Sequence, residues 1–207
     1  MPRIIDISPP IGPGLAVFPG DTPFSREILL DMARGDHITL STIRATVHLG
    51  SHADAPCHYG RNGAGVERLP LETYLGPCEV IHVPETRGRR VRVADLMAPV
   101  TATRVLLRTD SYPSPDQWNA DFAGVEPELV DHLADAGVKL LGIDTPSVDT
   151  SDSKDLLAHA RCLARDVLIV EGLVLGHVAP GAYEFVGLPL HLTGCDASPI
   201  RAVLRAP

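Results

Sequence analysis

Three histidines and one aspartate lie within eleven residues, in segment 48–58, whose sequence is HLGSHADAPCH. Imidazole and carboxylate groups are the ligands that Zn²⁺ and similar divalent ions prefer. On a helix, His48 and His52 would share a face, but Asp54 and His58 would turn away. A straight strand would place all four on one face, but at about 3.3 Å per residue His48 and Asp54 would lie roughly 20 Å apart. We therefore expect a strand that ends near His48 and a tight loop at Gly50 that brings three ligands around one ion. The alternative is a set of unrelated surface histidines.

Two downstream residues are candidates for completing such a site. Metal hydrolases commonly keep an open position for water, and a two-metal site needs further carboxylate or imidazole ligands. His159 lies in a predicted helix, and Glu171 follows the apolar run 168–170. A carboxylate at the end of such a run is badly placed for burial unless a positive charge compensates it, and a metal would do so. For Glu171, the alternative is a strand-end acid that reaches solvent.

Other titratable residues have weaker settings. Asp144 is followed by Thr145 and Pro146, which is typical of a strand-ending turn with a side-chain cap. The remaining histidines are interpreted as surface or core residues: His37, His82, His132, His177 and His191.

The motif resembles the His-x-Gly-Thr-His-x-Asp-x-Pro-x-His signature of the metal-dependent cyclase-type hydrolases. Ser51 replaces the usual Thr and keeps the hydroxyl. Within that family, the chain is most similar to the bacterial kynurenine formamidases (arylformamidases), from IDIS at 5–8 to DASP at 196–199. The resemblance implies a swivelling β/β/α-type fold and a homodimer.

The same resemblance implies a binuclear metal site. His48, His52 and Asp54 match ligands in the signature, and His159 and Glu171 match ligands of a second metal, with Asp54 bridging the pair. The expected cofactor is two Zn²⁺ ions per chain, with Mn²⁺ as an alternative metal.

His58 is then free to act as the catalytic acid–base, because its ordinary pKa near 6.5 suits proton transfer at neutral pH. Phe18 lies in the proline-rich loop 17–23, where the family usually carries a tryptophan associated with substrate. Phenylalanine keeps a ring face and loses the indole N–H. The alternative is that Phe18 packs into the core. Trp118 and Phe122 lie in a polar loop that either closes over a pocket or caps the core.

The reaction implied by the resemblance is hydrolysis of N-formylkynurenine to kynurenine and formate in tryptophan breakdown. One alternative is a cyclic amide hydrolase of the isatin-hydrolase type, with the same metals. A second is a metal-dependent binding or storage protein, with a closed site and no free base. No Gly-x-Ser-x-Gly elbow occurs in the chain, so the pattern does not favour a serine hydrolase.

Composition sets the broad class. A chain of 207 residues predicts a single domain, and its net charge of −8 argues against a nucleic-acid partner and leaves a small-molecule substrate. Four cysteines without CxxC spacing predict reduced, buried thiols and favour the cytosol. No signal-like segment or apolar run of about 18 residues is present, so we expect a soluble cytoplasmic protein with no membrane partner.

The elements that must position these residues are mostly strands. The patterns predict strands over 3–7, 38–47, 78–83, 104–109, 138–144, 167–170 and 183–190. They predict helices over 127–136 and 155–165 and one helical turn over 71–75, while 198–204 is ambiguous. Because strands outnumber helices and only the later half alternates, we expect an α/β fold of mixed sheets with flanking helices.

Overall fold

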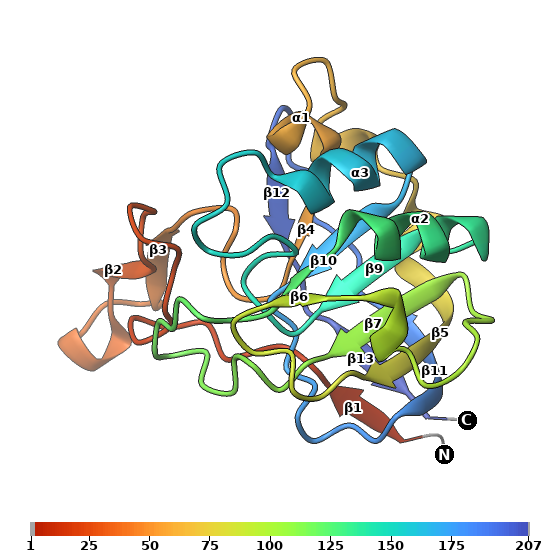
Figure 1. The fold of residues 1–207 in the computed structure, drawn as a ribbon. Helices are drawn as coiled ribbons and strands as arrows, with labels where there is room; N and C mark the ends of the chain where they lie inside the picture. The colour runs from red at the N-terminus through yellow and green to blue at the C-terminus, as the bar shows by residue number, and fades with distance from the viewer. Residues whose placement is uncertain (1–2, 207) are drawn as a thin grey trace.

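Nine strands form one large curled sheet in the computed structural model, which describes residues 3–206 (Figure 1). In spatial order the strands are β1 (Ile4–Asp6), β13 (Val203–Arg205), β11 (Gly181–Val186), β5 (Leu75–His82), β7 (Arg104–Arg108), β9 (Leu140–Ile143), β10 (Leu168–Glu171), β4 (His52–Asp54) and β12 (Ala197–Pro199). The central strands β5, β7, β9 and β10 are mutually parallel. The outer strands pair antiparallel, so the sheet is mixed as predicted.

Strands β9 and β10 are buried on both faces, which explains their nearly continuous apolar sequences. Successive side chains of a strand point to opposite faces. Leu106 and Leu140 therefore belong to the core inside the curl of the sheet, while Leu107 and Leu141 belong to a second core on the other face.

Two helices cover that second face (Figure 1). Helix α2 (Pro127–Asp135) begins with a proline in its first turn and buries Leu129, Val130 and Leu133. Helix α3 (Leu157–Arg165) packs against α2 and β10 and buries Ala158, His159 and Cys162. A histidine thus lies among the residues that α3 turns toward the sheet.

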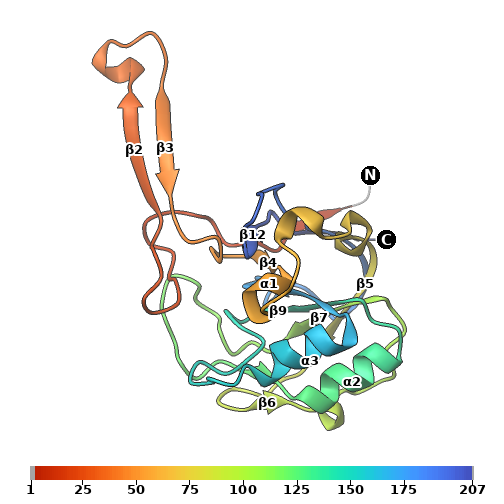
Figure 2. The ribbon, with the colours of Figure 1, turned by 90° about the horizontal axis from the view of Figure 1, so that it is seen from above.

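A hairpin of β2 (Ser25–Leu30) and β3 (Leu40–Arg44) extends away from the body as an isolated arm (Figure 2). Its strands are exposed along almost their whole length. The other short elements are β6 (Arg90–Val91) paired with β8 (Gly124–Val125), helix α1 (Pro56–Tyr59), and the 3₁₀ turns η1 (Met32–Arg34), η2 (Val66–Arg68), η3 (Leu71–Tyr74) and η4 (Val93–Asp95).

Most predicted elements are present, with shifted bounds. The helical turn over 71–75 is η3, and the strand over 183–190 begins earlier and ends at Val186. The ambiguous stretch 198–204 contributes to two separate strands, β12 and β13. The strand over 38–47 is shorter, ending at Arg44, and its partner β2 was not predicted.

All four cysteines are free, but only Cys78 and Cys162 are buried; the prediction of burial is wrong for Cys57 and Cys195, which are half-buried. None of the helices in residues 3–206 is both long and apolar enough to cross a membrane.

Candidate metal centre

Strand register brings three of the candidate ligands together. In the antiparallel pairing of β4 with β10, Glu171 lies opposite His52, and Ile169 lies opposite Asp54. Directly opposed side chains of antiparallel strands lie on the same face. His52, Asp54 and Glu171 therefore project together, toward the face that α3 covers, since Ile169 belongs to the core on that face. All three ligand candidates are buried.

This arrangement corrects the predicted loop. The strand before the motif ends at Arg44, not near His48, and His52 and Asp54 lie on a strand of their own. The physical reason is that His52 and Asp54 are two positions apart, with Ala53 between them, which is the spacing that places side chains on one face of a strand. Only His48 requires a turn, and Gly50 provides it with a φ of +60°.

The turn at Gly50 packs directly against the residue that follows Glu171. A Cβ on Gly172 would lie 2.2 Å from the carbonyl oxygen of Gly50, so only glycine fits this approach. The hydroxyl of Ser51 donates to the Gly172 carbonyl at 2.8 Å. The hydroxyl retained at position 51 thus ties the motif to the end of β10.

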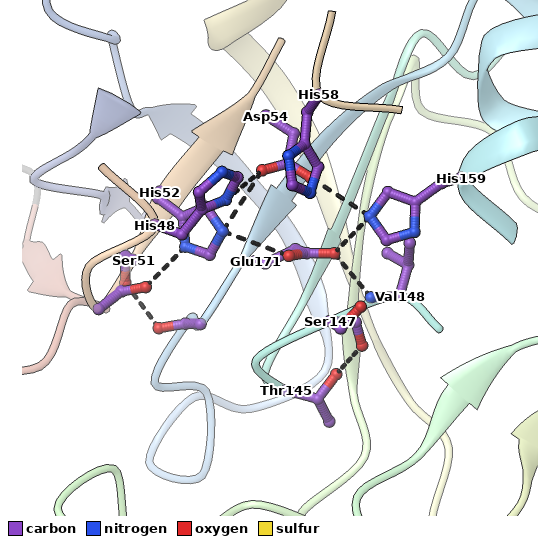
Figure 3. Close-up of polar contacts among 12 residues, drawn as sticks. His48, Ser51, His52, Asp54, His58, Thr145, Ser147, Val148, His159 and Glu171 are labelled. Atoms are coloured by element: carbon purple, nitrogen blue, oxygen red, sulfur yellow. Dashed lines mark hydrogen bonds and ion pairs between the residues drawn. The ribbon is translucent and has the colours of Figure 1, made fainter. Parts of the chain in front are cut away.

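The candidate ligand atoms converge on one another (Figure 3). Asp54 Oδ1 lies 3.1 Å from His48 Nδ1 and 3.4 Å from His52 Nε2, and Asp54 Oδ2 lies 3.3 Å from His159 Nε2. Glu171 divides its oxygens in the same way, at 3.2 Å from His52 Nε2 and 3.4 Å from His159 Nε2. Both carboxylates therefore span the space between His52 and His159.

These atoms fit divalent ions. Ligands about 2.0–2.2 Å from a tetrahedral Zn²⁺ are roughly 3.3–3.5 Å apart, close to the spacings above. Within residues 3–206, five buried side-chain polar atoms have no hydrogen-bond partner, and four belong to His52, Asp54 and His159. Because unpaired buried polar groups are costly, their convergence indicates a missing positive partner.

Each of the three candidate ligand histidines has its other ring nitrogen held by an acceptor. His52 Nδ1 lies 2.9 Å from the Gly50 carbonyl, His159 Nδ1 lies 2.8 Å from Asp149, and His48 Nε2 lies 3.0 Å from Asp196. Such contacts fix the tautomer and aim the free nitrogen of a metal-ligating histidine. Sequence analysis missed Asp149 and assigned no role to Asp196.

The electrostatics show how strongly the carboxylates need a cation. Burial disfavours the charged form of His52, but hydrogen bonds to Asp54 and Glu171 outweigh it and raise its pKa to about 10. Burial likewise opposes ionisation of Asp54, yet contacts with the surrounding histidines hold its pKa well below the usual value. The site therefore binds positive charge, as protons or as metal ions.

His58 lies at the edge of this cluster, on helix α1. Its ligand atom lies within 4.8 Å of those of His48 and Asp54, and its Nδ1 lies 3.4 Å from Asp196 Oδ2. Its side chain is 33% exposed, whereas those of Asp54 and His159 are almost completely buried. The position permits proton exchange with a bound molecule, and it also lies within reach of coordination beside His48.

The cluster opens into a cavity of about 490 Å³ that Phe18 lines. The Phe18 ring contacts Trp118 edge to face, with centroids 4.9 Å apart, and Trp118 also lines the cavity. Phe122 is buried beneath Trp118, so of the two loop aromatics one faces the cavity and one caps the core. Tyr112, which sequence analysis did not single out, lines the same wall.

Asp144 has the capping role that its sequence indicated. Its carboxylate accepts hydrogen bonds from the backbone N–H groups of Thr109 and Asp110 and from the Thr109 hydroxyl. The Asp144 carboxylate therefore joins the turn after β7 to the end of β9. These hydrogen bonds account for its burial without a metal ion.

Solved structures share this fold over the whole chain. A potential metal-dependent hydrolase with cyclase activity is 28% identical, with a TM-score of 0.86 over 100% of this chain and 99% of the other. A predicted metal-dependent hydrolase from Bacillus stearothermophilus is also 28% identical, with a TM-score of 0.83 over the full length of both chains. Isatin hydrolase A from Ralstonia solanacearum is 20% identical, with a TM-score of 0.84 over 100% of this chain and 92% of the other, and shares the fold.

A family model described as putative cyclase matches residues 5–150, which include the motif of segment 48–58. With most of the chain matched, the protein belongs to the putative cyclase family.

Proposed function

We propose that the protein is a metal-dependent hydrolase that converts N-formylkynurenine to kynurenine and formate. The observation that carries the proposal is the pair of buried carboxylates, Asp54 and Glu171, each directed toward both His52 and His159 at the floor of an aromatic-lined cavity. The 28% identical relatives described as metal-dependent hydrolases support the broad class. The aryl formamide substrate rests on the resemblance in the motif and on the aromatic wall.

The ligands would hold two divalent ions, which we propose to be zinc, with manganese as the alternative. His48, His52, Asp54, His159 and Glu171 would bind them. When bound, such ions lower the pKa of water and polarise a carbonyl oxygen. The protein's own contribution is to fix the ligands from opposed strands and from the buried face of helix α3, so that little rearrangement is needed.

His58 carries the proton in this proposal. Burial lowers its pKa below the ordinary value, so the imidazole is neutral at neutral pH and can accept a proton as water adds to the formyl carbon. Asp196, 3.4 Å from Nδ1, would orient the ring. His58 then delivers the proton to the aryl amine as the carbon–nitrogen bond breaks.

The aromatic wall would hold the aryl group of the substrate. Phe18 is 39% exposed and faces the cavity, so its ring is available for stacking. The Trp118 ring against its edge restricts the orientation of Phe18. A tryptophan is therefore present in the wall, although position 18 itself lacks one.

A cyclic amide hydrolase of the isatin-hydrolase type is the second candidate, because isatin hydrolases share this fold. The test is metal analysis coupled to turnover of N-formylkynurenine and of isatin by protein reconstituted with zinc or manganese. Preferential turnover of N-formylkynurenine with about two ions per chain supports the proposal. Turnover of isatin alone would identify the protein as a cyclic amide hydrolase. Metal binding with neither reaction would identify it as a metal-dependent binding protein.

We also propose a homodimer that forms through the β2–β3 arm. Ile43 and Met32 are 65% and 64% exposed, and both strands of the hairpin are free at their outer edges. An isolated two-stranded hairpin is marginally stable in water, so a second copy would stabilise it. Light scattering after size-exclusion chromatography tests this, with Ile43→Glu expected to give monomers; a monomeric wild-type protein would refute it.

A further inference from the structure

The loop over residues 150–157 forms one wall of the cavity and leads directly into α3. Asp149 closes the loop at its base, because its carboxylate accepts the N–H groups of Ala158 and His159, both at 3.1 Å. Within the loop, Ser153 N–H donates to the Thr150 carbonyl at 3.0 Å. The wall is therefore held in place by the same helix start that presents His159.

Lys154 places a positive charge on this wall of the cavity. Among residues 3–206 it is the only lysine or arginine that lines the cavity, whose other charged lining groups include Asp21, Asp144 and Asp196. Two of these carboxylates already have partners. Asp144 accepts hydrogen bonds from backbone N–H groups, and Asp196 contacts His48. Within residues 3–206, no ion pair joins Lys154 to a carboxylate, so its ammonium group is available to a ligand.

The same loop carries further polar side chains that line the cavity. Thr150 and Ser153 also line the cavity, and in the described part of the chain neither hydroxyl donates a hydrogen bond. Ser151, by contrast, is occupied by its donation to the Ala120 carbonyl at 2.6 Å. One cavity wall thus carries an ammonium and two hydroxyl donors, and these groups can bind a carboxylate through charge-assisted hydrogen bonds.

We propose that Lys154, with Thr150 and Ser153, forms a subsite for a carboxylate on the substrate. This inference rests on the proposed function and narrows its substrate class to aryl formamides that carry a carboxylate. N-Formylkynurenine has one on the side chain next to the formamide, whereas isatin is neutral and has none. Because one loop and helix carry both Lys154 and His159, the subsite lies at a fixed separation from the metal ligands.

The test compares two formamides and three variants. N-Formylkynurenine carries the carboxylate, and 2-formamidoacetophenone has the same ring, ketone and formamide but lacks the amino-acid group, both its carboxylate and its ammonium. Lys154→Met keeps the length of the side chain and removes the charge, and Lys154→Arg keeps the charge. Lys139 is the only other lysine and is exposed away from the cavity, so Lys139→Met is the matched control.

For N-formylkynurenine, Lys154→Met should lower kcat/KM by about tenfold, mainly by raising KM, in line with a charge-assisted contact that is partly exposed to solvent. For 2-formamidoacetophenone it should change little. Lys154→Arg should retain most of the activity on N-formylkynurenine, and Lys139→Met should match the wild type. In the wild type, added salt should raise KM for the charged substrate only.

Equal losses on both substrates would overturn the subsite and assign Lys154 to the structure of the loop. Unchanged kinetics of Lys154→Met would mean that the Lys154 side chain points into solvent and does not contact the substrate. If the wild type hydrolyses neither formamide, the proposed function fails, and calorimetry then tests the subsite by itself with kynurenine and 2-aminoacetophenone as probes. Binding of kynurenine that Lys154→Met weakens supports the subsite; the same affinity in both proteins, or no binding, refutes it.

Discussion

Asp149 should control metal affinity although it is not directed at the ligand cluster. Its carboxylate accepts from His159 Nδ1 at 2.8 Å and from two backbone N–H groups at the start of α3, and it lies 2.7 Å from the Arg90 guanidinium. Burial opposes its ionisation, but the hydrogen bond from His159 and the backbone donors hold its pKa at about 2. Asp149 is therefore ionised wherever the enzyme would work, and it orients His159 while making its free nitrogen more basic.

We predict that Asp149→Asn lowers zinc affinity by about 10–100-fold, the range expected when a carboxylate behind a ligating histidine is lost. The amide keeps an oxygen that can accept from one donor, so the start of α3 is retained. Asp149→Ala should have a further cost in stability, because it leaves Arg90 without its buried partner and two N–H groups uncapped. Removing one partner of a buried pair costs about 3–5 kcal/mol, and a lost helix cap about 1 kcal/mol.

The assay is competition for zinc against a chromophoric chelator, together with urea unfolding of the protein loaded with metal and stripped of it. Asp110→Asn is a matched control, because Asp110 pairs with Arg108 on the surface and lies away from the cluster. A variant Asp149→Asn that unfolds like the wild type but binds zinc with unchanged affinity would refute the orienting role. Equal zinc losses in the control variant would point to a general charge effect instead.

Asp54→Asn should lose more metal, measured by elemental analysis, than removal of either neighbouring histidine ligand, because its two oxygens face both metal positions. His58→Ala should keep its fold and metal while kcat falls about 10²–10⁴-fold; loss of metal would make His58 a ligand. Phe18→Ala should lower kcat/KM by roughly 1–2 kcal/mol with little change in Tm, whereas a large Tm loss alone would place Phe18 in the core. Asp95 pairs with Arg89, and this contact lowers the pKa of Asp95 below its value in the unfolded chain. The ionised Asp95 therefore stabilises the fold above about pH 4, and this stabilisation disappears as the pH falls through the folded-state pKa. Asp95→Asn should thus cost about 1 kcal/mol in urea unfolding at pH 7, and this cost should shrink as the pH falls below about 4; a constant difference would contradict this.

Much of the candidate site could be predicted because its residues have local signals. His52 and Asp54 alternate as a strand requires, and Glu171 ends an apolar run where an acid is otherwise costly. His159 has no such signal, since a buried histidine on an amphipathic helix resembles a core residue; its place came from the family resemblance. Asp149 and Asp196 lie in loops without periodicity, and the contact between Asp196 and His48 spans 148 residues.

The hairpin shows a different limit of sequence patterns. Alternation identifies a strand only when one face is buried, and β2 and β3 are exposed on both faces. The sequence SREILL of β2 therefore has no clear pattern of period two, and only β3 fell within a predicted strand. The predicted loop of ligands failed for a different reason, because the distance argument treated His48, His52 and Asp54 as one segment, whereas only His52 and Asp54 lie on strand β4.

The start of α3 joins the two halves of the proposed chemistry. One carboxylate, that of Asp149, closes the loop of Lys154, satisfies the first N–H groups of the helix and holds the ring of His159. Changes at Asp149 should therefore disturb metal binding and substrate affinity together. Changes at Lys154 should alter the affinity for carboxylate-bearing substrates alone, since its side chain supports none of these contacts. That difference separates a residue that builds the site from one that selects its substrate.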